Sequence, residues 1–453
     1  MSLLSALSIG RSALRAATAG IDVTAHNVSN AMTPGFGRQR VELLSAGSHV
    51  DGHGLWLGSG ASVVGFVRTT DTMLGIRQTA AAADGARSGS YAGLLEGAEI
   101  YFNETSSNGP ALVTSAFFDA LDAATVDPSD GSLRAAVVAS AVDLGATVSA
   151  TREGLVGQQA GAAGAFAASV IDINALLADV AAANSSITNG GATPDTLDAI
   201  DTAVRGLAEL AGATMSVEPN GTTTVYIGGH AAVSGDCVRT VTFDDSTGSP
   251  RLLLSTGSTT VDLTPALDGA VRGQLDAIEE IETWISDLDA FAEQFASLVN
   301  TQLAAGFDLA GNPGAPLFTV GVPAGGTLAV NAAMTNDPSL LAFSSDPFGG
   351  PVDGGNLVLL TALSETGTID GQPPEQFLSA LASRVATSVS SARSAADQDA
   401  SYASDLDALQ IGVSGVNLDE EAANLIVWQA AYQAAAAVIA ATDETLSFLM
   451  ELV

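Results

Sequence analysis

The stretch Ala25–Leu43, AHNVSNAMTPGFGRQRVEL, ends a helix-like N-terminal segment and turns the chain into an extended run. Within it, Thr33-Pro34-Gly35-Phe36 favours a type II turn, because proline fixes the second position and glycine tolerates positive φ at the third. The residue before a proline avoids helical conformation, so the helix is expected to stop here. Asn27 and Asn30 can hydrogen-bond nearby backbone and ease the exit.

An apolar heptad precedes this stretch, and another closes the chain. A helix with one apolar stripe needs a partner helix. We therefore predict that the two ends form one antiparallel, coiled-coil-like helix pair, and we call its apolar stripes the seam. Periodicity alone leaves open an ordinary core-packing helix at each end. The predicted seam residues are Leu7, Leu14, Ile21, Val28, Leu418, Leu425, Tyr432, Ile439 and Leu446.

The middle of the chain reads as long helices around a β-rich module. Between Gly273 and Gly306 apolar residues recur every three or four positions, and Gly306 is expected to cap that helix. Further helices are expected over 133–184 and 374–409. From 214 to 263 apolar and polar residues alternate with a period of two, as in strands, and Asn220-Gly221 indicates a hairpin turn.

The predicted fold class is mainly α with a small inserted β-rich domain, elongated and nested. An axial helix, turn and extended arm occupy 1–70 and pair with 410–453. A long-helix domain covers 71–205 and 270–409 and includes a Gly/Pro-rich loop at 306–355. The inserted β-rich outer domain covers 206–269.

Charge excludes some classes of partner. The 453-residue chain has a formal net charge of −35 and contains no lysine. Nucleic acids and anionic membrane surfaces need a basic face, so neither is expected as a partner. The N-terminus lacks the basic start of a cleaved secretory signal, and no apolar run suggests a membrane span.

Catalytic patterns are missing. A phosphate-binding P-loop needs a lysine, and no nucleophile-elbow pattern occurs. His49, Asp51 and His53 alternate as metal ligands can, but neighbouring glycines favour an exposed loop. The single cysteine, Cys237, is expected to be buried in apolar surroundings. We predict no enzyme activity, no cofactor and no metal site.

Both ends resemble the rod, hook and hook-associated family of bacterial flagellar axial proteins. In that family an Asn-rich exit leads into a Thr-Pro-Gly-aromatic turn, as in the opening stretch. The C-terminal SGVNLDEEAANLIVWQAAYQAAAAVIAATDETLSFLMEL is similar to the family's last helix. GRQRV after the turn and SGVNLDEE favour a hook-associated junction protein over a hook or rod subunit. In the middle, FAEQFASLVNTQLAAGFDLAGNPGAPLF resembles the family's passage from helix to loop.

The resemblance implies a secreted structural subunit that joins the hook to the filament. It implies export through the flagellar type III apparatus and assembly as a ring of identical copies, in which the seam residues named above form the assembly seam. The implied partners are the hook protein, a second hook-associated junction protein (FlgL type) and an export chaperone (FlgN type) on residues 418–453. Two alternatives stay open: another axial protein, such as a hook or distal rod subunit, and an acidic secreted enzyme or adhesin.

A single-striped terminal helix cannot bury its apolar face alone. The terminal helices are therefore expected to be weakly ordered in the isolated monomer and to become ordered in the assembly.

Overall fold

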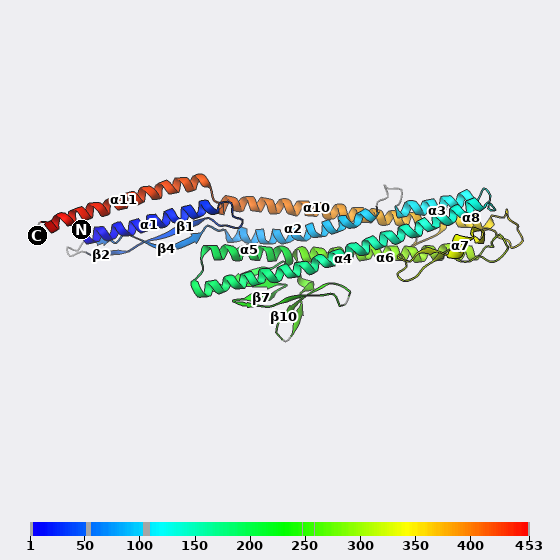
Figure 1. The fold of residues 1–453 in the computed structure, drawn as a ribbon, viewed down its shortest axis with the longest axis horizontal. Coiled ribbons are helices and arrows are strands. Elements are labelled where there is room, and N and C mark those ends of the chain that lie inside the picture. Colours follow the sequence, from blue (N-terminus) through cyan, green and yellow to red (C-terminus); the bar gives the residue numbers. More distant parts are fainter. Residues whose placement is uncertain (1–2, 51–55, 103–108, 247, 258, 452–453) are drawn as a thin grey trace.

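The computed structural model describes residues 3–50, 56–102, 109–246, 248–257 and 259–451. The molecule is long and narrow, and its helices run roughly along its length (Figure 1). α1 (Leu3–Asn30) begins and α11 (Leu418–Glu451) ends at the same tip of the molecule. The predicted fold class, mainly α with a small β-rich insertion, is confirmed.

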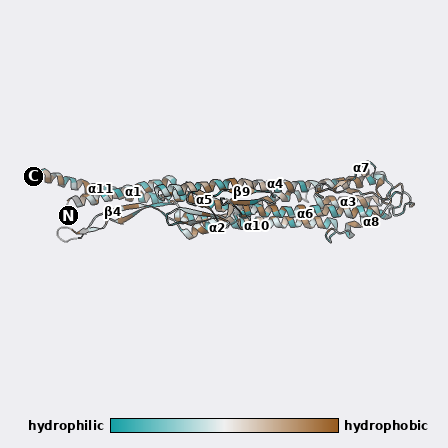
Figure 2. Cartoon of the chain, turned by 90° about the horizontal axis from the view of Figure 1, so that it is seen from below, coloured by the Kyte–Doolittle hydropathy of each residue, from teal (hydrophilic) through white to brown (hydrophobic). Residues whose placement is uncertain are grey.

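Long helices form the body of the molecule. α2 (Thr72–Glu99) packs against α10 (Pro374–Ser414) and α6 (Gly269–Ala304), and α4 (Gly131–Gly190) packs against α6 and α3 (Pro110–Ala124). In Figure 2 apolar residues are distributed along the whole length of these helices. The expected apolar stripe of α6 is buried throughout, at Ile278, Ile281, Ile285, Leu288, Ala292, Phe295 and Val299.

Aromatic rings fill the core near α3. Phe117 contacts Phe295 edge to face with ring centroids 5.8 Å apart, and Phe291 stacks on Phe295 at 5.3 Å. Such pairs add about 0.5–1.5 kcal/mol beyond the burial of their area. This end of the bundle is therefore anchored by rings, although aromatic residues are only 5% of the chain.

The β-rich insertion contains two small sheets. One is four-stranded, β5 (Thr214–Val217), β6 (Thr223–Ile227), β7 (His230–Ser234) and β8 (Cys237–Val238); the other has the order β11 (Thr260–Asp262), β10 (Arg251–Ser255), β9 (Val241–Asp244). The predicted hairpin joins β5 to β6, and Gly221 there has φ of 87°. Val225 and Leu252 are buried in one core with Phe166 of α4 and Leu207 of α5 (Pro194–Ala211).

The Gly/Pro-rich segment 306–355 folds over one end of the bundle. It contains β12 (Phe318–Thr319), β13 (Ala329–Val330), α7 (Ala332–Asn336) and a 3₁₀ turn (Pro338–Leu340), and α8 (Gly355–Thr361) and α9 (Leu363–Thr366) follow. Further 3₁₀ turns lie at Ile100–Phe102 and Thr264–Ala266.

Arg134 of α4 ties this segment to the bundle. Its guanidinium donates to the carbonyls of Pro128 and Leu341 and lies 4.4 Å from the centre of the Phe343 ring. Burial lowers the pKa of Arg134 to about 10.

The N-terminal arm runs beside α1. β1 (Gln39–Ser45) pairs with β4 (Ala61–Arg68) in an antiparallel ribbon, and β2 (Ser48–Val50) pairs with β3 (Trp56–Gly58). Asp51 and His53 lie outside the described residues, as does the side chain of His49. Among the described residues, no group of three or more His, Cys, Asp or Glu side chains could hold a metal ion.

Several expectations are wrong in detail. Helix α5 continues to Ala211, past the predicted start of the β-rich domain at 206, and α6 ends at Ala304 with Ala305 as its cap instead of Gly306. Cys237 is exposed, because the two-residue strand that carries it lies at the edge of its sheet.

The sequence was expected to contain no segment with the length and hydropathy of a membrane span, and this expectation is also wrong. The stretches Gly131–Gly190 and Pro374–Glu451 both pass that test. Alanine raises the hydropathy of both. The apolar window of the first is 39% buried, as suits a core helix, whereas that of the second is only 11% buried.

Candidate assembly site

Both terminal helices are formed and docked in the single chain, unlike the weak order expected of them in the isolated monomer. They pack against each other through small residues of α1. A Cβ added at Gly10 would lie 2.9 Å from Cγ1 of Ile439, and one added at Gly20 would overlap the Trp428 ring. Gly10 thus faces Ile439 and Gly20 faces Trp428, so the helices are antiparallel. Ala17 and Thr24, on the same face of α1, are buried. Close approach of the two backbones therefore depends on small side chains.

The predicted seam residues do not all lie on this contact. Leu7, Leu14 and Ile21 are half-buried, whereas Val28 is 45% exposed. The face of α1 that contacts α11 instead carries Gly10 and Gly20, with the buried Ala17 and Thr24 beside them. The prediction named large apolar residues as the contact, whereas Trp428 of α11 packs where α1 has glycine, at Gly20.

On α11 the seam is likewise divided. Leu425, Ile439 and Leu446 are half-buried, whereas Leu418 and Tyr432 are 55% and 41% exposed. Many large apolar side chains of α11 remain exposed in the single chain. They are Leu418, Ile426, Val427, Tyr432, Val438, Phe448, Leu449 and Met450.

The predicted turn forms at the end of α1. The Phe36 N–H donates to the Thr33 carbonyl at 3.2 Å, and Gly35 has φ of 78°, as a type II turn requires. Asn30 closes the helix by donating to the His26 carbonyl at 3.1 Å, and its side-chain oxygen accepts from the Thr33 hydroxyl at 3.2 Å. Thr33, Pro34 and Gly35 are exposed.

Asn27 fastens the returning chain to α1. Its amide nitrogen donates to the Gln39 carbonyl at 2.8 Å, and its amide oxygen accepts from the Gln39 N–H at 3.0 Å. Asn27 is buried, and both polar ends of its amide are satisfied. The asparagine therefore fixes where β1 starts relative to the helix.

A second link joins the turn to α11. The Arg38 guanidinium donates to Glu421 at 2.7 Å and pairs with Glu420 at 3.1 Å, and the Asn27 amide donates to Glu421 at 3.2 Å. The Arg38 N–H also donates to the Ser414 carbonyl at 3.0 Å. Reasoning from the sequence did not identify Arg38 and Glu421 as residues of this contact. Their only signal was their place in GRQRV and SGVNLDEE.

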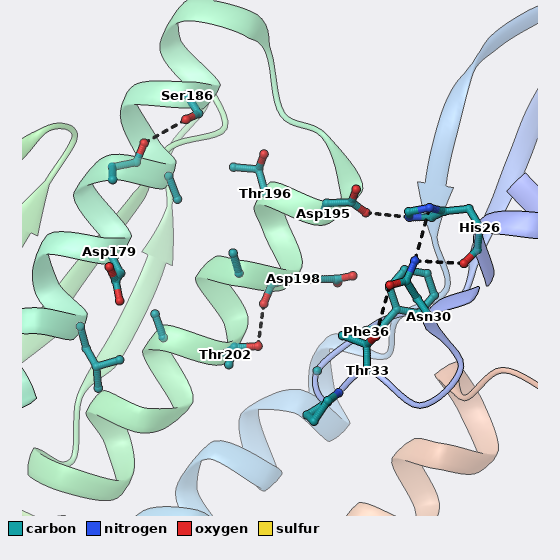
Figure 3. A pocket seen from close by; sticks show the side chains of 17 residues that line it. His26, Asn30, Thr33, Phe36, Asp179, Ser186, Asp195, Thr196, Asp198 and Thr202 are labelled. Atoms are coloured by element: carbon teal, nitrogen blue, oxygen red, sulfur yellow. Dashed lines mark hydrogen bonds and ion pairs between the residues drawn. The ribbon is translucent and has the colours of Figure 1, made fainter. Parts of the chain in front are cut away.

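A third link joins the same turn to α5, as Figure 3 shows in part. The side chain of Asp195 accepts from Gln39 at 2.7 Å and lies 3.3 Å from the His26 ring. Asp198 accepts from the Gly37 N–H at 3.0 Å and from Arg68 at 2.7 Å.

Burial raises the pKa of Asp198, although the hydrogen bonds from Arg68 and Gly37 oppose that rise. The turn thus contacts α1, α11 and α5 together. We call this set of contacts, made by Asn27, Arg38, Gln39, Arg68, Asp195, Asp198 and Glu421, the joint.

An open groove of 760 Å³ lies beside the joint, between the turn and helices α4 and α5. Thr33 and Phe36 lie on one side of the groove, and Asp179 and Asp195 lie on the other (Figure 3). The Phe36 ring meets the His26 ring edge to face at 5.4 Å. Among the described residues that line the groove, no set of nucleophile, base and oxyanion donors comes together.

Two models of known protein families match this sequence. Residues 95–318 match the family model "Flagellar hook-associated protein FlgK helical domain", and residues 411–452 match "Flagellar basal body rod FlgEFG protein C-terminal". The first match covers α3 to α6 with the β-rich insertion. The second covers α11 and the end of α10.

Relatives agree with these matches. The flagellar hook-associated protein 1 of Escherichia coli K12 is 28% identical over 73% of this chain. The chain spans 64% of that relative's length. The protein of the same name from Bacillus subtilis 168 is 24% identical over 97% of this chain and 96% of its own.

A solved structure has the same fold. The flagellar hook junction protein FlgK from Burkholderia pseudomallei superposes with a TM-score of 0.68 and 15% identity, over 75% of this chain and all of that one. The family matches, the relatives and the shared fold agree with the terminal signatures of the sequence. The chain belongs to the family of FlgK-type flagellar hook-associated proteins.

Proposed function

We propose that this chain is a structural subunit of the bacterial flagellum that joins the hook to the filament. The observation that carries the proposal is the mostly exposed apolar surface of α11, on a helix docked beside α1. Only Glu421, Ala435 and Thr442 of α11 are fully buried in the single chain. Each Leu or Ile buried on assembly contributes about 1.5–3 kcal/mol, so many copies packed together stabilise one another.

The assembly we propose is a ring of identical copies, with α1 and α11 toward its axis and the helical body outside. The joint supports this arrangement, because it holds the terminal pair to the body at the point where the chain leaves the inner helices. A cofactor or catalytic step has no place in it; the role is structural.

The partners we propose are the hook protein on one side and a second junction protein of FlgL type on the other. Before assembly, an export chaperone of FlgN type is proposed to hold residues 418–453 and to cover their apolar surface. The protein would leave the cell through the flagellar type III apparatus. A pulldown in which deletion of 418–453 leaves chaperone binding intact would remove this step.

Electron microscopy of a strain that lacks the protein tests the main proposal. We expect hooks without filaments, with filament subunits shed into the medium, and recovery of filaments when the gene is restored. Missing hooks would instead favour the alternative, a hook or distal rod subunit. Normal filaments would overturn both.

A further inference from the structure

A second groove, of 600 Å³, lies on the side of α1 away from α11, between α1 and β4. The Ala61 N–H donates to the Ser12 hydroxyl at 3.3 Å, which fixes the spacing of helix and strand at the floor of the groove. The lining residues of α1 are Leu7, Ser8, Arg11, Ser12 and Arg15.

Two arginines in this groove have no acidic partner. Arg11 and Arg15 are exposed, one helical turn apart, and neither pairs with Asp or Glu among the residues that the structure describes. Elsewhere in the described chain most arginines are ion-paired to a carboxylate. In a protein with 50 acidic residues, an unpaired basic pair is a surface of opposite charge to most of the molecule.

The helix α11 has the complementary charge. It contains six acidic residues and no basic residue. Asp443 and Glu444 are exposed, without an ion pair in the described chain. Glu444 also continues a stripe of exposed residues spaced by three and four along one face, which therefore points away from the α1 contact: Val427, Ala430, Ala434, Ala437, Ala441, Glu444 and Phe448.

Within one chain, Glu444 of α11 does not reach Arg11 and Arg15 of α1. Gly10 faces Ile439 and Gly20 faces Trp428, so α11 already occupies another face of α1. That antiparallel register places Glu444 roughly six residues beyond Arg11, which is roughly 9 Å at 1.5 Å per residue. A neighbouring copy shifted along the helix axis by roughly 9–15 Å would bring its Glu444 level with Arg11 and Arg15.

We propose that the groove between α1 and β4 receives α11 of a second copy of this chain, with Glu444 of that copy against Arg11 and Arg15. The small residues of the stripe allow the helix to enter the groove closely. The charge pair then sets the axial position of one copy against the next, because other registers would leave Glu444 away from Arg11 and Arg15. This inference rests on the proposed function and specifies its subunit contact.

Cysteine cross-linking in assembled flagella tests the contact. Two variants in a Cys237→Ser background, Arg11→Cys and Glu444→Cys, are co-expressed in a strain that lacks the native protein. Flagella are isolated, oxidised mildly and analysed on a non-reducing gel. A disulfide-linked dimer is expected, and because each chain has one cysteine, the dimer joins two copies. Arg239→Cys, at an exposed arginine of the β-rich insertion, replaces Arg11→Cys as the control and should give none.

The outcomes separate this inference from the function. Protein present in isolated flagella without the dimer overturns the contact and leaves the proposed function standing. Protein absent from flagella, even without substitutions, overturns both.

Charge reversal gives a second test. Arg11→Glu should lower the amount of protein in isolated flagella about tenfold, equivalent to about 1.4 kcal/mol. Adding Glu444→Arg on the same chain should restore most of it, whereas Arg239→Glu alone should change little. The pairing would be contradicted if the double variant stayed as scarce in isolated flagella as Arg11→Glu, while Glu444→Arg alone was present in the normal amount.

Discussion

Arg38 and Glu421 lie 383 residues apart in the chain, yet the Arg38 Nε donates to the Glu421 carboxylate at 2.7 Å. The Glu421 side chain is almost fully buried, and the Asn27 amide gives it a further hydrogen bond. A buried carboxylate needs such partners, because an unpaired charge in the interior is costly. The contact therefore ties the start of α11 to the turn that ends α1.

Glu421→Ala should loosen this tie. Removing the carboxylate leaves the Asn27 amide and the Arg38 guanidinium short of an acceptor, at a cost of about 1–3 kcal/mol. Amide hydrogen exchange of the isolated protein should then rise at the start of β1 and in the first turns of α11. Glu420→Ala is the matched control, because its side chain is 58% exposed and its pair with Arg38 should contribute about 0–1 kcal/mol. Equal effects of the two variants would contradict the role of burial.

Gly20→Ala should separate the terminal helices. An added Cβ would overlap the Trp428 ring, so that ring must move away from α1. We expect a loss of about 1–3 kcal/mol from overpacking and a red-shifted tryptophan emission as the ring becomes more exposed.

Gly75→Ala is the control for this variant. Gly75 also lies in a helix, but a Cβ there meets nothing within 4 Å. Since alanine favours helix over glycine, Gly75→Ala should stabilise α2 by up to about 1 kcal/mol. If Gly20→Ala leaves the emission of the protein unchanged, the contact between Gly20 and Trp428 is wrong.

Features set by neighbouring residues could be predicted from the sequence. The α6 stripe is unbroken by glycine or proline, so its period identified both the helix and its buried face. The turn at Thr33–Phe36 follows from proline and glycine at fixed positions and needs no distant partner. The hairpin at Asn220-Gly221 is local in the same way.

Features that depend on residues far apart in the chain could not be predicted from the sequence. Nothing near Arg38 indicates that its partner is Glu421, since the sequence has many other carboxylates. The contact face of α1 was missed for a related reason: glycine has no hydrophobic signal of its own, and Gly20 matters only because Trp428 lies opposite. Nothing in the sequence indicates that Asp195 and Asp198 of α5 contact the turn, or that Asp198 and Asp201 pair with Arg68.

Acid should weaken the loop that Asp353 braces. Its carboxylate accepts from the Ser344 hydroxyl and from the N–H groups of Ser345, Asp346 and Gly355. These hydrogen bonds hold the pKa of Asp353 well below its usual range. Because the folded pKa is lowered, the stabilisation is present above the unfolded value of about 3.9 and is lost as pH falls below it.

The variant Asp353→Asn measures how much the ionised carboxylate of Asp353 stabilises the fold. At neutral pH the variant should melt at a lower temperature than the unmodified protein, by an amount that corresponds to at most about 1 kcal/mol. The difference should shrink as the pH is lowered from about 4 toward 2, because the unmodified carboxylate loses the same interaction. A difference that stays constant across this range would show that the charge of Asp353 is not the cause.

Ile439→Asp should block assembly while leaving the body of the molecule folded. The half-buried Ile439 side chain packs against Gly10, so a carboxylate there would replace an apolar contact with a partly desolvated charge. The long-helix core lies elsewhere, so circular dichroism should show little loss of helix beyond the terminal pair. Isolated flagella should contain little or none of the variant, and cells that carry it should shed filament subunits. Ile171→Asp is the matched control, because Ile171 is 70% exposed on α4. If Ile439→Asp joins hook and filament as well as Ile171→Asp does, the pairing of the terminal helices is not what builds the junction.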